Sequence, residues 1–314
     1  MPSTQKNSVQ EQRIVALALD DQMVYAFFVL VHSLVTTKRH PFHLIVGYFK
    51  GRLSLAHRKL MVAFLDHLGQ SAEMRELVRH PLFTERRHLT ITTFSKFVIS
   101  DAVKDAHLWI DLDTIARDGW DDFFEPLNSA PSTVALVVAS KLESPHTRFD
   151  GFNAGVLGWT RAPREEWLPE LANLPEKRFS SEQHLFNTLY KDNCDSVDVR
   201  FNFLSSWHEQ SQELARASII HYSGPLKPWH LARRHAQAWA LVNPSWSAWF
   251  DGETDLFRRL ASTPLEGPLK ELGRKAVFSG RLHTGKGALA GWVLRGLAVL
   301  GPLGKPVVWW LARR

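Results

Sequence analysis

The stretch HLWIDLD, residues 107–113, is the segment that decides the fold class. Its first four residues are an apolar run typical of a buried strand, and that run stops at Asp111. Side chains two positions apart lie on the same face of a strand, so Asp111 and Asp113 converge where the strand ends. Paired carboxylates suit a hard cation such as Mg²⁺ or Mn²⁺. Because Asp-x-Asp also arises often by chance, the motif alone is a weak indication of a metal site.

Outward from this segment, apolar runs of strand length alternate with segments of helical periodicity. Strands are predicted over residues 13–19, 42–49, 88–93, 107–110, 133–139 and 155–159. Helices are predicted over residues 23–34, 55–68, 94–102 and 181–190. Such alternation predicts an α/β fold with a mostly parallel central sheet, in which ligands bind beyond the carboxyl ends of the strands. Asp20 follows the first strand as Asp111 follows a later one, so we expect both at that edge of the sheet.

The composition is that of a globular protein. Of its 314 residues, 45% are hydrophobic and 22% charged, which provides a sizeable core and excludes a disordered or fibrous chain. The single cysteine, Cys194, excludes a disulfide framework and a cysteine-cluster metal site. The polar start lacks the apolar core of a secretory signal, and no run approaches the ~18 apolar residues of a spanning helix. We therefore expect a cytoplasmic protein.

The positive charge is concentrated towards the C-terminal end. A formal net charge of +6 at first suggests a polyanionic partner such as nucleic acid. After Glu271, however, there are eight basic and no acidic residues, whereas residues 1–271 contain 30 basic and 32 acidic residues. Residues 1–271 therefore have no excess of positive charge that could form an extended phosphate-binding face. We predict no nucleic-acid partner.

Three further segments place polar side chains beside turns or helix starts. After residues 218–220, His221 can complete a metal site, Gly224 permits close backbone approach and Lys227 offers a charge to a phosphate. Taken alone, this segment is better explained as a strand end followed by a turn. A negative charge is favourable in the first turn of a helix, which explains Glu182 but gives its neighbour Gln183 no structural role. The third segment, FNAGV, places small residues between an aromatic side chain and a strand.

Seven segments occur in an order that is highly specific. They are IVALALDD, HLTITTFSKF, HLWIDLDTIARD, FNAGVLGW, SSEQHLFN, VRFNF and IIHYSGPLKPWH. Together they resemble the family 8 retaining glycosyltransferases, most closely those that add galactose to bacterial lipo-oligosaccharide. The resemblance extends from about Ile14 to His230, roughly two thirds of the chain.

The resemblance implies a GT-A fold, a UDP-sugar donor, and Mn²⁺ or Mg²⁺ as cofactor. Carried over by position, the implied metal ligands are Asp111, Asp113 and His221. The implied nucleotide-sugar-binding residues are Asp20, Asp21, Gln22, Lys96, Asp111, Leu112, Asn153, Ala154, Gly155, Gly224 and Lys227. The implied catalytic residues are Glu182, which would bind sugar hydroxyls, and Gln183, which would lie beside the anomeric carbon. A divalent ion and Lys227 would stabilise the negative charge that develops on the UDP leaving group.

The chain departs from the family pattern at positions that bear on the sugar, the base and the acceptor. Lys96 stands where close relatives have arginine, and Glu182 stands where they have aspartate. Met23 occupies the position of an aromatic residue, with Tyr25 two positions later as another possible stacking partner for uracil. Residues 139–150 lack the usual acidic contact to the acceptor.

The implied function is that of a retaining hexosyltransferase that moves galactose or glucose from a UDP-sugar to a bacterial surface glycan such as lipopolysaccharide core. Front-face substitution is favoured because Gln183 is a poor nucleophile, and double displacement through Glu182 or another carboxylate stays open. The alternative is a catalytically inactive GT-A-like module that only binds a sugar nucleotide. The five intact site residues Asp111, Asp113, Gln183, His221 and Lys227 argue against that alternative.

The chain is predicted to consist of a glycosyltransferase domain, residues 1–262, and a basic tail, residues 263–314. Proline and glycine at positions 264, 267, 268 and 273 predict a loop-rich linker. Residues 274–314 combine eight basic side chains with tryptophans, which favours binding to an anionic membrane surface. We therefore expect a peripheral protein on the inner face of the cytoplasmic membrane, with a glycan or glycolipid acceptor.

Overall fold

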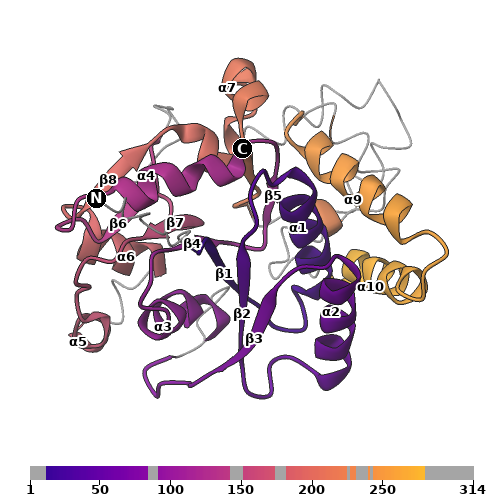
Figure 1. Cartoon of the computed structure of the whole chain (residues 1–314), viewed down its shortest axis with the longest axis horizontal. Coiled ribbons are helices and arrows are strands. Elements are labelled where there is room, and N and C mark those ends of the chain that lie inside the picture. Colours follow the sequence, from indigo (N-terminus) through magenta and orange to yellow (C-terminus); the bar gives the residue numbers. More distant parts are fainter. Residues whose placement is uncertain are drawn as a thin grey trace, which may run out of the picture.

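The computed structural model describes residues 12–83, 91–141, 151–173, 182–224, 227–230, 240 and 243–279. In these residues, strands and helices alternate and build an α/β fold around a central sheet (Figure 1). The sheet has seven strands in the order β3-β2-β1-β4-β7-β6-β8. Their bounds, in that order, are Ala72–Leu77, His43–Phe49, Ile14–Ala18, His107–Ile110, Val156–Trp159, Leu136–Ala139 and Cys194–Val197.

Most neighbouring strands are parallel, but β7 runs against both of its neighbours. The strands β3, β2, β1 and β4 are parallel, as are β6 and β8, whereas β7 is antiparallel to β4 and β6. The predicted mostly parallel sheet is therefore confirmed, and it is also mixed. Because β1 and β4 are parallel, Asp20 and Asp111 follow their carboxyl ends at one edge of the sheet, as predicted.

A small second sheet brings two distant parts of the chain together at that edge. It consists of β5 (Thr114–Ala116), β10 (Ile219–His221) and β9 (Phe203–Leu204), in the order β5-β10-β9. His221 is paired with Thr114 in the antiparallel ladder of β10 and β5. The end of β10 therefore lies directly beside the Asp-x-Asp segment.

The alternating side chains of β1 divide the core into two layers. Val15 and Leu17 pack on one face with helices α1, α2, α9 and α10, and Ala16 packs on the other face with α3, α5 and α6 (Figure 1). The helix bounds are α1 Val24–Thr37, α2 Leu55–His67, α3 Ser95–Ala102, α4 Phe124–Ser129, α5 Trp167–Asn173, α6 Glu182–Tyr190, α7 Ser211–Arg216, α9 Trp246–Leu260 and α10 Glu266–Ser279. Among the described helices, none is long and apolar enough to cross a membrane.

Two strand predictions need correction, and one strand was missed. Ile91–Phe94 forms a 3-10 helix, so the strand predicted over 88–93 is wrong there, and 88–90 lie outside the described residues. The strand predicted from 133 begins only at Leu136. The edge strand β3 (AEMREL) was not predicted, because three charged residues interrupt any apolar run. Backbone pairing with β2, rather than an apolar pattern, makes this segment a strand.

The loop-rich linker predicted over 264–273 is wrong, because Glu266–Ser279 forms helix α10. Pro268 lies in the first turn of α10, where a backbone N–H has no intrahelical partner to lose. A Cβ added to Gly273 would come within 2.9 Å of the Tyr25 ring, so this glycine permits close packing on α1. Leu269 and Ala276 belong to the same core cluster as α1. Helix α10 is therefore packed on the main body.

Candidate functional site

Backbone hydrogen bonds hold the Asp111-Leu112-Asp113 turn between the two sheets. The N–H of Asp111 donates to the carbonyl of Gly155 at 2.8 Å, which ties the turn to the start of β7. The carbonyl of Asp113 accepts from the N–H of Tyr222 at 2.7 Å, which ties it to the end of β10. The Leu112 side chain is buried in the core, so only its backbone is available to a ligand. The turn therefore presents its two carboxylates.

Asp111, Asp113 and His221 come together at this turn. One ligand atom from each residue lies within 4.8 Å of the ligand atoms of the other two. Nε2 of His221 is 3.3 Å from Oδ1 of Asp113, and the histidine is buried. Two carboxylates and an imidazole are a donor set that suits Mn²⁺ or Mg²⁺. The three residues form a group that can hold a metal ion.

Two lysine ammonium groups balance these carboxylates. Nζ of Lys96 is 2.9 Å from Oδ2 of Asp111, and Nζ of Lys227 is 2.6 Å from Oδ2 of Asp113. Burial by itself would raise the pKa of Asp113, but that pKa is lowered, and the ammonium of Lys227 is the largest opposing effect. Burial raises the pKa of Asp111 in spite of Lys96, and the charge of Asp113 raises it further. Asp113 is therefore the more strongly ionised of the two carboxylates.

Lys96 is buried at the centre of the site and connects its two sides. Only 4% of its side chain is exposed. Its ammonium donates to Oδ2 of Asp111 and to the carbonyl of Ala154, both at 2.9 Å, and lies 3.4 Å from Oε1 of Glu182. Burial lowers the pKa of this ammonium, but Asp111 and Glu182 outweigh it and raise the pKa. Since an ammonium has three hydrogens, all of them face protein oxygens.

Gln183, at the start of α6, faces the turn that precedes β7. Its Oε1 accepts from Nδ2 of Asn153 at 3.0 Å and from the N–H of Ala154 at 3.5 Å. Oδ1 of Asn153 in turn accepts from the N–H of Gly155 at 2.9 Å. The residues predicted to surround the donor sugar are therefore adjacent in space, and the Asn153 amide links them.

Asp20 and Asp21, the two aspartates predicted to bind the nucleotide, make different contacts. Asp20 is buried, and its carboxylate accepts from the N–H of Gln22 at 3.0 Å and from Oγ1 of Thr92 at 3.1 Å. Burial raises the pKa of Asp20 in spite of these hydrogen bonds. Asp21 instead turns to the start of α2, where its Oδ1 is 2.6 Å from Nδ1 of His57. Asp20 and Gln22 thus lie together at the sheet edge, and Asp21 anchors a helix.

Tyr25 is not a stacking partner for uracil. Its ring packs beside Gly273 and is 5% exposed, and its hydroxyl donates to Glu253. This hydrogen bond connects α1 to α9, and the Tyr25 ring is part of the hydrophobic core. Met23, at the position predicted for the stacking aromatic residue, is half-buried.

The loop after β10 leads to Lys227 by way of Gly224. The ammonium of Lys227 donates to Oδ2 of Asp113 and to the carbonyl of Tyr222, both at 2.6 Å. Among the described residues, apart from the chain neighbours of Gly224, no atom lies within 4 Å of a Cβ added to this glycine. Lys227 reaches Asp113 of the metal-ligand group.

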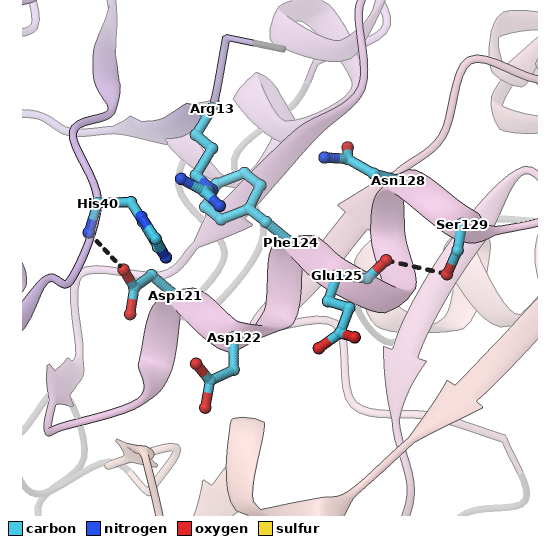
Figure 2. A pocket seen from close by; sticks show the side chains of 8 residues that line it. All are labelled: Arg13, His40, Asp121, Asp122, Phe124, Glu125, Asn128 and Ser129. Atoms are coloured by element: carbon cyan, nitrogen blue, oxygen red, sulfur yellow. Dashed lines mark hydrogen bonds between the residues drawn. The ribbon is translucent and has the colours of Figure 1, made fainter. Parts of the chain in front are cut away.

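A separate hollow of about 470 Å³ lies at the opposite edge of the sheet, where β1 begins (Figure 2). Arg13, His40 and the acidic residues Asp121, Asp122 and Glu125 line it. The buried Asp121 carboxylate accepts from the backbone N–H groups of Arg39 and His40 at 2.8 and 2.9 Å. The hollow faces away from the carboxyl ends of β1 and β4, so its acids do not contribute to the site around Asp111.

A match to a protein-family model shows which family this chain belongs to. Residues 14–232 match the model of glycosyl transferase family 8. The chain belongs to glycosyltransferase family 8. It is 22% identical over 251 residues to the lipopolysaccharide 1,3-galactosyltransferase of Salmonella typhimurium, covering 69% of this chain and 72% of that protein.

Solved structures of glycosyltransferases share the fold. The galactosyltransferase LgtC, solved in complex with donor and acceptor sugar analogues, superimposes with a TM-score of 0.56 at 20% identity, covering 83% of this chain and 95% of that one. The glycosyltransferase GlyE of Streptococcus pneumoniae superimposes with a TM-score of 0.59 at 19% identity, covering 85% of this chain and 64% of that one. At such identities the likeness shows the fold alone. The expected family and a GT-A-like fold are confirmed.

Two residues that organise the site of this family 8 glycosyltransferase were not predicted. Asn202 lies between His221 and Asn153 and donates to Oδ1 of Asn153 at 2.9 Å. Trp109 donates from Nε1 to Oδ1 of Asp111 at 2.7 Å. Both lie in segments that resemble the family, but an asparagine or tryptophan beside a strand has no local pattern that reveals its hydrogen-bond partner. Only the fold brings these partners together.

We expect Gly155→Ala to disrupt the site although it adds only one methyl group. A Cβ at this position would lie 2.2 Å from Cε1 and 2.4 Å from Nδ1 of His221, a contact that no buried ring can accept without moving. The His221 ring contacts Asn202 on one side and Asp113 on the other, so a shift away from the added methyl group would disturb these contacts. We therefore expect metal affinity to fall about tenfold or more. Calorimetric titration with Mn²⁺ measures this loss. Gly51→Ala, on an open turn, adds only backbone strain and should bind Mn²⁺ as the wild type does. Unchanged Mn²⁺ affinity in Gly155→Ala would contradict the expected clash.

Proposed function

We propose that this glycosyltransferase moves galactose or glucose from a UDP-sugar to a bacterial surface glycan such as lipopolysaccharide core, and that the product retains the donor's configuration. The observation that carries the proposal is the convergence, at the carboxyl ends of β1 and β4, of a metal-ligand group with the Gln183 network. The names of the similar proteins, a lipopolysaccharide galactosyltransferase and the galactosyltransferase LgtC, support the sugar and the acceptor class.

The metal-ligand group fits the chemistry of a diphosphate leaving group. Asp111, Asp113 and His221 would hold Mn²⁺ or Mg²⁺. When bound, the ion would neutralise negative charge on the departing UDP. Lys227 would add a second positive charge beside the diphosphate.

The residues around the anomeric carbon favour front-face substitution. The Glu182 carboxylate faces the buried ammonium of Lys96, which lowers its nucleophilicity, and the amide of Gln183 is a poor nucleophile. The acceptor hydroxyl would therefore attack on the face that UDP leaves, and a phosphate oxygen would take its proton. Double displacement through Glu182 is the competing route and would leave a sugar covalently bound to that residue.

The deciding experiment is a screen of UDP-sugars for UDP release with Mn²⁺, with and without lipopolysaccharide-core oligosaccharides. We expect release from UDP-galactose or UDP-glucose that excess EDTA abolishes and added Mn²⁺ restores. An α-linked product by NMR would support retention, and a β-linked product would contradict it. UDP binding without turnover of any donor and acceptor pair would favour the alternative of an inactive sugar-nucleotide-binding module.

We further propose that the basic segment after α10 binds an anionic membrane surface and brings the enzyme to a lipid-linked acceptor. Each basic side chain near such a surface contributes about 1 kcal/mol of binding free energy. Since α10 packs on the main body, the segment to remove begins after Ser279. A protein that ends at Ser279 should fail to sediment with vesicles of phosphatidylglycerol yet keep turnover on water-soluble acceptors. Equal sedimentation of both proteins would show that this segment is not the anchor.

A further inference from the structure

We infer that Asn202 is a positioning residue that fixes the hydrogen-bonding direction of both His221 and Gln183. The inference deepens the proposed function and rests on it only in taking His221 as a metal ligand and Gln183 as a neighbour of the donor sugar. It concerns a continuous chain of four side chains, His221, Asn202, Asn153 and Gln183, which joins the metal-ligand group to the start of α6.

The hydrogen bonds of this chain have ordinary lengths, and the end at His221 and Asn202 is buried. Nδ1 of His221 is 3.1 Å from Oδ1 of Asn202. Nδ2 of Asn202 donates to Oδ1 of Asn153 at 2.9 Å, and Nδ2 of Asn153 donates to Oε1 of Gln183 at 3.0 Å. Asn202 is 2% exposed and His221 is 4% exposed. Buried polar groups without a partner are costly, so the members of this chain have strong reason to keep these bonds.

Two backbone groups settle which end of each amide is oxygen and which is nitrogen. The N–H of Gly155 can only donate, so the Asn153 atom that faces it at 2.9 Å is the oxygen. The carbonyl of Asn153 can only accept, so the Asn202 atom that faces it at 3.4 Å is the NH₂ group. Neither side-chain amide can be turned around without placing like groups against each other. All the hydrogen bonds of the chain therefore point in one direction.

This direction bears on which nitrogen of His221 carries the hydrogen. Oδ1 of Asn202 faces Nδ1 at 3.1 Å and Oδ1 of Asp113 faces Nε2 at 3.3 Å, and both oxygens can only accept. The contact with Asn202 is the shorter one, and Lys227 already balances the charge of Asp113, so we place the hydrogen of the neutral imidazole on Nδ1. Nε2 then keeps its lone pair, and it is this atom that lies 3.3 Å from Oδ1 of Asp113. Asn202 thus prepares His221 to bind a metal through Nε2, the arrangement that a hydrogen-bond partner on the other ring nitrogen provides.

The same direction determines which end of Gln183 remains for a ligand. Its Oε1 is occupied by Nδ2 of Asn153, and the N–H of Ala154 approaches the same oxygen. Among the described residues, no group binds its Nε2. Gln183 therefore offers hydrogens to the donor sugar, and its amide oxygen is withheld from nucleophilic attack. This orientation is a reason, independent of the weak nucleophilicity of amides, for front-face substitution.

Two substitutions of Asn202 separate the two ends of the chain. Asn202→Asp keeps an acceptor for Nδ1 of His221 but has no hydrogen for Asn153, so only the link to Gln183 is lost. Asn202→Leu keeps the branching and the number of side-chain heavy atoms and loses both links. Asn193→Leu serves as control, because Asn193 binds the backbone of Ala135 at the far end of β6, remote from Asp111. Circular dichroism establishes that each variant is folded.

The first measurement is the histidine tautomer, which a merely structural role would not change. In protein labelled with ¹⁵N-histidine, long-range ¹H–¹⁵N correlation spectra at a pH where the ring is neutral should show the hydrogen of His221 on Nδ1. His221→Asn assigns the signal. We expect Asn202→Asp and Asn193→Leu to keep this tautomer and Asn202→Leu to lose it. A hydrogen on Nε2 in the wild type, or an unchanged tautomer in a folded Asn202→Leu, would overturn the inference.

The second measurement separates metal binding from turnover. Titration of Mn²⁺ followed by electron paramagnetic resonance should give an affinity no weaker than that of the wild type for Asn202→Asp, whose carboxylate still accepts from Nδ1 of His221, and about 10- to 100-fold weaker affinity for Asn202→Leu. In Asn202→Asp, kcat should fall about tenfold or more with little change in KM, because Gln183 is then free to turn. Wild-type kcat in Asn202→Asp would overturn the link to Gln183. If the tautomers follow expectation but Mn²⁺ does not bind the wild type, the positioning role of Asn202 holds and the proposed metal-dependent function fails.

Discussion

Asp113→Asn is expected to lower kcat by at least about 1,000-fold while the protein stays folded. The Asp113 carboxylate lies 3.3 Å from Nε2 of His221 and 2.6 Å from Nζ of Lys227. It also belongs, with Asp111, to the metal-ligand group. A bound metal stabilises transition-state charge by several kcal/mol, and each ~1.4 kcal/mol corresponds to a factor of ten in rate. Asparagine has the same shape and can still accept from Lys227, so the fold should tolerate it. Steady-state UDP release and Mn²⁺ titration measure the loss.

Asp118→Asn is the matched control for this substitution. Asp118 follows β5 on the same segment as Asp113, but its side chain is exposed to solvent. We expect wild-type kcat and wild-type Mn²⁺ affinity for this variant. Substantial turnover by Asp113→Asn at saturating Mn²⁺ would show that the carboxylate is not needed for the chemistry.

Lys96→Met is expected to destabilise the fold and to abolish turnover together. The buried ammonium of Lys96 faces Asp111, Glu182 and a backbone carbonyl, and methionine replaces it with an apolar group of similar length. The two carboxylates then lose their shared cation, and removing one partner of a buried ion pair costs about 3–5 kcal/mol. At about 2–4 °C per kcal/mol for a large domain, the thermal midpoint should fall by roughly 10 °C.

Lys104→Met tests whether loss of any lysine near α3 has the same effect. Lys104 is exposed two residues beyond the end of α3, and its loss should change the free energy of unfolding by less than about 0.5 kcal/mol. The stability of Lys96→Arg should lie between those of Lys96→Met and Lys104→Met. Arginine keeps the charge, but its larger, planar group must fit where only 4% of the Lys96 side chain is exposed. A Lys96→Met protein as stable as the wild type would mean that Asp111 and Glu182 are neutralised in another way.

The parts of the fold that depend on local pattern were predictable from the sequence. The apolar runs gave β1, β2 and β4 nearly to the residue, and helical spacing gave α1, α2, α3 and α6. The closeness of Asp111 and Asp113 was also predicted, but not its reason: β4 ends at Ile110, and the two aspartates lie on a turn that Gly155 and Tyr222 hold in place. The order of the motifs indicated the family and, with it, the distant histidine of the metal-ligand group.

Segments whose structure depends on distant contacts were missed. β3 is a strand because it pairs with β2, although its sequence is charged. Proline and glycine over 264–273 suggest a linker, but in α10 the proline lies in the first turn and Gly273 makes room for Tyr25. In both cases contacts with distant parts of the chain outweigh the local composition: backbone pairing with β2 for β3, and packing on α1 for α10.

The sequence by itself determined the family, the strand-end carboxylates and the order in which the site residues occur along the chain. Only the tertiary structure decided how those residues bind one another: that Lys96 is buried between Asp111 and Glu182, that Tyr25 serves the core, and that Asn202 sets the direction of the hydrogen bonds. The physical reason is that a hydrogen bond depends on distances of about 3 Å between atoms far apart in sequence. Residue order does not encode such distances, and the packing of β4, β7, β10 and α6 against one another creates them.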